Sequence, residues 1–102
     1  MLVSGWKSGK FVTRRAVALG IRIGSENVER FFDKNWDVVL IETEGGTIPV
    51  KITGTFWTSC PELRSPAIGI WMRKKGLVPW PKGRPPEMRL IPLGRNRFRL
   101  DL

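Results

Sequence analysis

Residues 55–66, TFWTSCPELRSP, bring together side chains suited to recognising a polar polymer. The planar guanidinium of Arg64 can bond two acceptors at once. The hydroxyls of Thr58 and Ser59, together with backbone amides, can hold anionic oxygens, and Glu62 can accept from an amine or orient Arg64. Trp57 offers a flat apolar surface, for contact or for stiffening the segment from beneath. This mixture favours binding over covalent chemistry.

Two further groups of basic residues could serve the same purpose. Residues 1–24 contain five basic and no acidic side chains, and a tight group of polar and basic residues occurs there, made of Lys10, Thr13, Arg14 and Arg15. Lys82 and Arg84 lie in a proline-rich stretch, where contact with phosphate or solvent is expected. Lys51 precedes the 55–66 segment.

The overall charge indicates what kind of partner such residues would meet. Lysine and arginine number 18 against 9 acidic residues, a net charge of +9. Residues 25–50 hold two basic and six acidic side chains, whereas residues 51–102 hold eleven and three. A fold with this distribution can present one basic face, which suits a polyanion such as nucleic acid. A basic surface that serves only solubility is the alternative.

Missing residue types narrow the possible chemistry. The chain has no histidine and one cysteine, Cys60, which excludes histidine-dependent triads, most zinc sites and an intrachain disulfide. No phosphate-binding GxxxxGK[ST] loop occurs. A metal-dependent nuclease site would have to use Asp37, Glu42, Glu44 and Lys51, but two of these acids flank a hairpin turn. We therefore expect no enzyme activity, no cofactor and no metal.

Length and hydropathy predict one domain over residues 1–102. No run reaches the ~18 apolar residues of a membrane helix, and the first residues lack the apolar centre of a secretion signal. These features predict no membrane association and a cytoplasmic location, at the nucleoid in a microbe or in the nucleus of a eukaryote.

Short strands and one helix are predicted for the first half of the chain. Alternating apolar residues place strands at 10–14 and 19–24. A helix follows over 25–35, with Ser25 as N-cap and an apolar stripe of Val28, Phe31 and Phe32.

A hairpin is predicted next, with its turn at Gly45-Gly46. The unbroken apolar run 38–41 in its first strand is typical of a strand buried on both faces. Pro49, in the second strand, lacks a backbone donor and belongs at an edge or a bulge.

The second half is predicted to form a helix and a closing hairpin. Ser65 is a suitable N-cap, Pro66 fits the first helical position and Gly76 can end the helix in a left-handed conformation. Residues 87–102 form two strands around residues 94–96. Six or seven short strands with two small helices predict a mainly β (α+β) barrel with helices over its ends.

The order of these pieces resembles the B3-type DNA-binding pseudobarrel, found in plant B3 transcription factors and in DNA-recognition domains of some Type II restriction endonucleases. Four stretches carry the resemblance over residues 10–102: IRIGSENVERFF, VVLIETEGGTIPVKI, GTFWTSCPELRSPAIGIWMRKKGLVPW and RLIPLGRNRFRLDL. Plant members usually have a Gly-Asp turn where this chain has PWPKGRPP, which favours a microbial or phage relative. The resemblance implies a seven-stranded open pseudobarrel with two short helices.

In this family two arms grip the major groove, and the resemblance assigns both arms here. The first arm corresponds to residues 10–17 and the second arm to residues 55–64. The implied DNA-binding residues are Lys10, Thr13, Arg14, Arg15, Lys51, Trp57, Thr58, Ser59, Glu62, Arg64, Lys82 and Arg84. The implied partner is double-stranded DNA, with a separate nuclease or regulatory protein as a further partner class in restriction or transcription regulation.

Other functions remain open at this stage. A small barrel with exposed aromatics can bind RNA or single strands by stacking. A basic face can also block an acidic protein partner.

Overall fold

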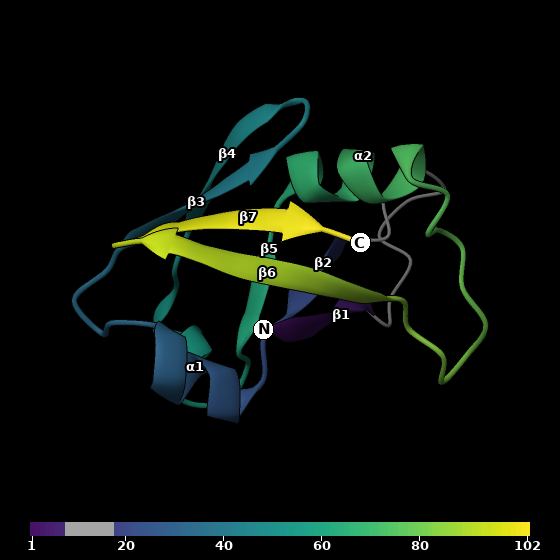
Figure 1. The fold of residues 1–102 in the computed structure, drawn as a ribbon. Coiled ribbons are helices and arrows are strands. Elements are labelled where there is room, and N and C mark those ends of the chain that lie inside the picture. The colour runs from purple at the N-terminus through teal and green to yellow at the C-terminus, as the bar shows by residue number, and fades with distance from the viewer. Residues whose placement is uncertain (8–17) are drawn as a thin grey trace.

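The computed structural model describes residues 1–7 and 18–102, and Figure 1 shows the fold. In these residues the strands are β1 (Leu2–Lys7), β2 (Leu19–Arg22), β3 (Val38–Thr43), β4 (Gly46–Lys51), β5 (Glu62–Arg64), β6 (Glu87–Gly94) and β7 (Arg97–Asp101). The helices are α1 (Ser25–Phe31), α2 (Pro66–Lys74) and the short 3₁₀ helix η1 (Gly54–Trp57). None of the described helices is long and apolar enough to cross a membrane.

The strands form one mixed sheet in the order β4-β3-β7-β6-β1-β2-β5. All neighbouring pairs are antiparallel except β3 and β7, which run parallel. The two end strands, β4 and β5, approach each other without pairing, so the sheet curls into a nearly closed barrel. The predicted mainly β pseudobarrel with two helices is confirmed. Pro49 lies in the end strand β4, where its missing donor interrupts no second ladder.

The barrel is filled by the inward-facing residues of every strand, together with one face of α2. Seventeen hydrophobic side chains are buried: Val3, Leu19, Ile21, Ile23, Val39, Ile41, Val50, Ile52, Phe56, Leu63, Ile68, Trp71, Met72, Met88, Leu90, Phe98 and Leu100. Among residues 1–7 and 18–102 no polar or charged residue falls in this buried class. The core is therefore held by apolar burial, the main favourable term in folding.

The two α-helices lie at opposite ends of the barrel (Figure 1). Ser65 begins α2 as predicted, since its Oγ accepts the N–H of Ala67 at 3.2 Å. Gly69 is buried where α2 packs against β2. A Cβ there would lie 3.3 Å from the Leu19 side chain, so glycine lets the helix approach the strand closely. Gly76 ends the helix at φ 72°, as predicted.

Several local predictions differ from the structure. The first described strand is β1, which the sequence reading did not predict, and the predicted strand at 10–14 lies outside the described residues. Ser25 is the first residue of α1 and Gly24 is its N-cap, with no side-chain capping bond. The helix also ends at Phe31, four residues early. In β3, Val39 and Ile41 are buried but Val38 is exposed, so only one face of that strand is fully buried.

Candidate nucleic-acid interface

The described residues that border the two predicted arms lie beside opposite ends of β2. The chain leaves β1 at Lys7, which pairs with Leu19 at the start of β2, while Arg22 at the other end pairs with Glu62. The first-arm residues Lys10, Thr13, Arg14 and Arg15 lie outside the described residues. The described surface between the two attachment points is the outer side of three strands. We call it the β1–β2–β5 face and define it by Ser4, Trp6, Arg22, Glu62 and Arg64.

One row across this face fixes the position of Arg64. Trp6, Gly20 and Arg64 are neighbours across β1, β2 and β5. Gly20 carries no side chain, and a Cβ there would lie 2.3 Å from the Leu63 carbonyl oxygen. The Arg64 side chain therefore crosses the middle strand, and its guanidinium carbon lies 4.5 Å from the centre of the Trp6 ring. This is a cation–π contact, and it leaves the N–H groups at the guanidinium edge available to a ligand.

The second row holds an ion pair. Ser4, Arg22 and Glu62 are neighbours across the same three strands. Arg22 Nη2 lies 3.9 Å from Glu62 Oε1, and the side chains are 59% and 7% exposed. The suggestion that Glu62 orients Arg64 is wrong, because Glu62 pairs with Arg22 and Trp6 supports Arg64. Glu62 Oε2 is buried and has no hydrogen-bond partner in the described part of the chain.

The second arm is a compact turn. The backbone N–H groups of Thr58, Ser59 and Cys60 all point to the Thr55 carbonyl oxygen, at 3.2, 3.0 and 2.8 Å. Phe56 is buried at 2% exposure and anchors the turn to the core. The side chains of Thr58 and Ser59 are exposed, where hydroxyls can meet phosphate oxygens.

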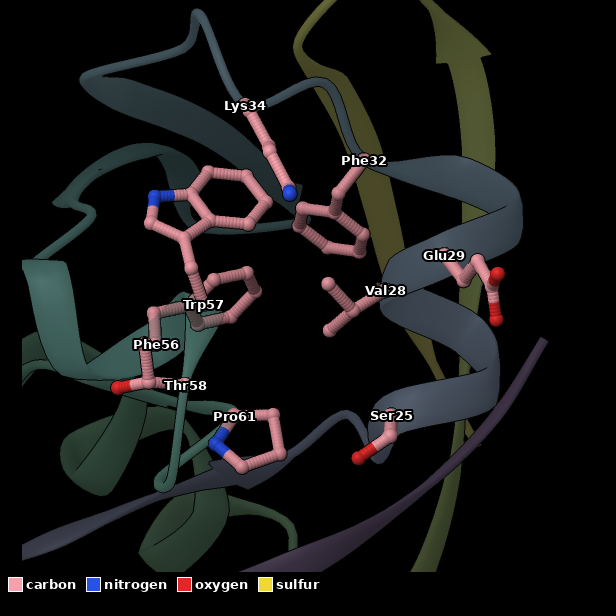
Figure 2. A pocket seen from close by; sticks show the side chains of 9 residues that line it. All are labelled: Ser25, Val28, Glu29, Phe32, Lys34, Phe56, Trp57, Thr58 and Pro61. Carbon is pink, nitrogen blue, oxygen red and sulfur yellow. The ribbon is translucent and has the colours of Figure 1, made fainter.

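Trp57 is half-buried and stiffens the second arm, one of the two roles weighed for it from the sequence, while its contact with a partner stays a prediction. Its ring packs edge-on against Phe56, with centroids 4.9 Å apart and an 87° angle between planes, so it stiffens the arm. Its remaining surface lines a pocket of about 300 Å³ between the second arm and α1 (Figure 2). The other lining residues are Ser25, Val28, Glu29, Phe32, Lys34, Phe56, Thr58 and Pro61. Sequence reasoning missed this pocket, because Val28 and Phe32 have the spacing of a core stripe.

Further exposed basic residues lie at the end of α2 and in the connection after it: Arg73, Lys74, Lys75, Lys82 and Arg84. The Lys7 amino group lies 5.2 Å from the Trp80 ring centre, which joins β1 to the proline-rich connection. Lys82 and Arg84 are exposed in that connection. Lys51 lies elsewhere, at the end of β4 where the chain enters the second arm.

One lysine at the end of α2 is paired with an acidic residue. Lys75 forms an ion pair with Glu44, which also accepts the indole N–H of Trp71 at 3.3 Å. The bond from Lys75, with smaller contributions from the Glu44 backbone and Trp71, lowers the pKa of Glu44 from 4.5 to about 2. Glu44 and Glu42 thus serve ion pairs, the latter with Arg97 at 3.4 Å.

The structure also has a second basic surface, which the sequence analysis did not predict. The outer side of β1, β6 and β7, here called the β6–β7 face, carries arginines among exposed apolar residues: Leu2, Arg89, Ile91, Leu93, Arg97 and Arg99. Leu2 is 63% and Leu93 46% exposed. Alternating arginine and aliphatic side chains are typical of protein contacts.

Comparisons with protein-family models, with curated proteins and with solved structures found no match to this chain.

Proposed function

We propose that this chain is a sequence-specific binding domain for double-stranded DNA, without catalytic activity, related in architecture to the B3-type pseudobarrels. The two arms enter the major groove from the two ends of β2, and the β1–β2–β5 face lies against the groove between them. A separate nuclease or regulatory protein would act on the bound site.

The row of Trp6, Gly20 and Arg64 carries this proposal. An arginine that reads guanine needs its guanidinium edge free and its plane fixed, since a bidentate contact is directional. The Trp6 ring supports the plane, and the absence of a side chain at Gly20 gives Arg64 room to cross β2. A solubilising arginine would need no such support.

The neighbouring groups fit the same partner. Arg22 is exposed beside Arg64, so a second guanidinium can meet a base or a phosphate on this face. Thr58 and Ser59 can hold phosphates at one end of the face. Lys82 and Arg84, both exposed, add positive charge in the connection after α2.

Selection of bound sequences from a random duplex library tests the proposal. We expect a short consensus site and an affinity that falls steeply with salt. About five phosphate contacts give a slope of log K against log salt of about −4 to −5. Arg64→Ala should weaken the selected site more than a scrambled duplex. The matched control is Arg99→Ala, an exposed arginine on β7 that should leave both affinities unchanged. A slope near zero, or no enriched sequence, refutes the proposal.

A second candidate function rests on the β6–β7 face. Its exposed Leu2, Ile91 and Leu93, with Arg89 and Arg99 between them, fit a protein partner with an acidic and apolar surface. If nucleic acid fails to bind at low salt while Arg99→Ala abolishes capture of such a partner, this candidate replaces the first.

A further inference from the structure

The pocket beside the second arm has rigid aromatic walls. The ring of Phe32 stacks on Phe98 with centroids 4.9 Å apart and a 16° angle between planes, and it also contacts Phe56 at 5.2 Å. Trp57 is held edge-on by Phe56 on the other side. Figure 2 shows the Trp57 and Phe32 rings approaching the pocket from opposite sides, with Val28 below them. Because the core braces both rings, the walls keep their separation when a ligand enters.

The size of the pocket restricts what it can hold. Its volume of about 300 Å³ is at the lower limit of small-molecule sites, which run from roughly 300 to 1,000 Å³. One flat ring system fits this space, whereas a peptide segment or a large cofactor does not. Aromatic walls favour a ring that can stack.

The polar groups at the opening fit an anion attached to that ring. Lys34 is exposed and extends its amino group toward the space between the two rings, and the Ser25 hydroxyl faces the pocket from the opposite side (Figure 2). The Glu29 carboxylate points away from the pocket. The ion pairs found within residues 1–7 and 18–102 do not include Lys34. A flat ring with a phosphate beside a lysine is the chemistry of a nucleotide.

The pocket is continuous with the proposed DNA contact. Trp57, Thr58 and Pro61 belong to the second arm and also line the pocket, so a nucleotide inside it would lie next to the arm that enters the groove. A base within a duplex is stacked on both sides and cannot reach an aromatic wall, whereas a base turned out of the helix can.

We propose that this pocket binds one nucleotide whose base lies outside the double helix, with the base between Trp57 and Phe32 and its phosphate at Lys34. The inference rests on the proposed DNA binding and deepens it: the domain reads paired bases on the β1–β2–β5 face and accepts a single unpaired base beside the second arm. The preferred ligand is then a duplex that carries a flipped or bulged base near the recognised sequence.

The test compares three probes of the same sequence: a fully paired duplex, the duplex with one bulged nucleotide, and the single strand. The wild-type chain should bind the bulged duplex about tenfold or more tighter than the paired one, because base–aromatic stacking is worth about that much per base. Iodouracil at the bulged position, irradiated in the complex, should cross-link to Trp57 or Phe32.

Two variants separate the pocket from the fold. Trp57→Leu should reduce the preference for the bulge to about one, with the melting temperature measured on the same sample. Lys34→Gln changes an exposed side chain and should keep the fold intact while reducing the preference about threefold or more. Arg30→Gln is the matched control, since Arg30 is an exposed base of α1 that does not line the pocket.

The outcomes distinguish the two proposals. Equal affinity for paired and bulged duplexes, unchanged by Trp57→Leu and Lys34→Gln, overturns the pocket and leaves duplex recognition standing. No binding to any probe overturns both. Tightest binding to the single strand, lost in Trp57→Leu, supports the pocket and refutes duplex recognition.

Discussion

Replacing Arg64 and Trp6, singly and together, tests how the β1–β2–β5 face reads DNA. Arg64→Ala removes a guanidinium that lies 4.5 Å from the Trp6 ring centre. A good bidentate arginine–guanine pair contributes about 1–3 kcal/mol of discrimination, so the selected site should lose that much affinity. The folded state should lose only about 0.5–1 kcal/mol, the value of an exposed cation–π contact.

Trp6 should act through Arg64. Trp6→Leu keeps an apolar residue on the face but frees the guanidinium, and ordering such a side chain on binding costs about 0.5–1.5 kcal/mol. The same change made in the Arg64→Ala background should cost less than about 0.5 kcal/mol, because nothing remains for Trp6 to hold. The double-mutant cycle therefore predicts a coupling close to the whole effect of Trp6→Leu.

The affinities of the wild type, the two single variants and the double variant are measured by fluorescence anisotropy. In each measurement the selected site competes with a scrambled duplex. Arg99→Ala is the control for loss of one exposed positive charge. Two results would refute the reasoning. If Arg64→Ala weakens both duplexes equally, Arg64 holds phosphate and reads no base. If Trp6→Leu costs the same with and without Arg64, the stacked pair has no part in recognition.

Four further substitutions test other parts of the molecule. Lys82→Ala and Arg84→Ala should each weaken all duplexes alike and make the salt slope shallower by about 0.9, since phosphates carry no sequence; a changed base preference in the selection experiment would contradict this. Phe56→Ala should cost about 3–5 kcal/mol and lower the melting temperature by about 10 °C or more, because it empties the core beneath the second arm; a smaller fall in calorimetry would mean that the arm is not anchored there. Glu44→Gln tests the bond to Lys75: the pKa of Glu44 is lowered from 4.5 to about 2, so its stabilisation is present above pH 4.5 and is lost as the pH falls toward 2. The difference in melting temperature between wild type and Glu44→Gln should shrink across that range, and a constant difference would refute the bond.

Local chemistry was enough to predict the elements whose ends are marked by single residues. Ser65 caps α2 and Gly76 ends it, and both conformations follow from the side chain or its absence. The hairpin between β3 and β4 was predicted for the same reason, but its two-residue turn is Glu44-Gly45, one residue earlier than the predicted Gly45-Gly46. Gly24 shows the limit of the method: it takes the N-cap position of α1 at φ 84°, which leaves the better capping residue, Ser25, inside the helix.

Elements that depend on distant contacts were missed. In β1 the inward residues are Val3 and Gly5 while Leu2 and Trp6 face outward, so the apolar pattern does not show which face is buried. The inward position of Gly5 suits glycine because Pro86 fills the space beside it, and a Cβ there would lie 2.9 Å from the proline ring. In β5 a single inward residue, Leu63, gives no period to detect.

The site was predicted unevenly for the same reason. Arg64 was chosen from its chemistry and its place in the second arm. Its support by Trp6 could not be read from the sequence, since it depends on the pairing of β1, β2 and β5 and on the absence of a side chain at Gly20. The pocket at Trp57 was hidden because Phe32, one of its walls, has the spacing of a core residue.

Net charge alone cannot choose between the two basic faces of the barrel, but the surroundings of their arginines can. On the β6–β7 face, Arg97 pairs with Glu42 at 3.4 Å, so an acid already neutralises part of the charge. On the β1–β2–β5 face, the acid beside Arg22 is itself nearly buried, and an aromatic ring supports Arg64. Pairing an arginine with acid neutralises it toward a polyanion, whereas stacking it on a ring keeps its charge and fixes its direction. The second arrangement is the one that base recognition requires, which is why the proposed interface lies on the β1–β2–β5 face.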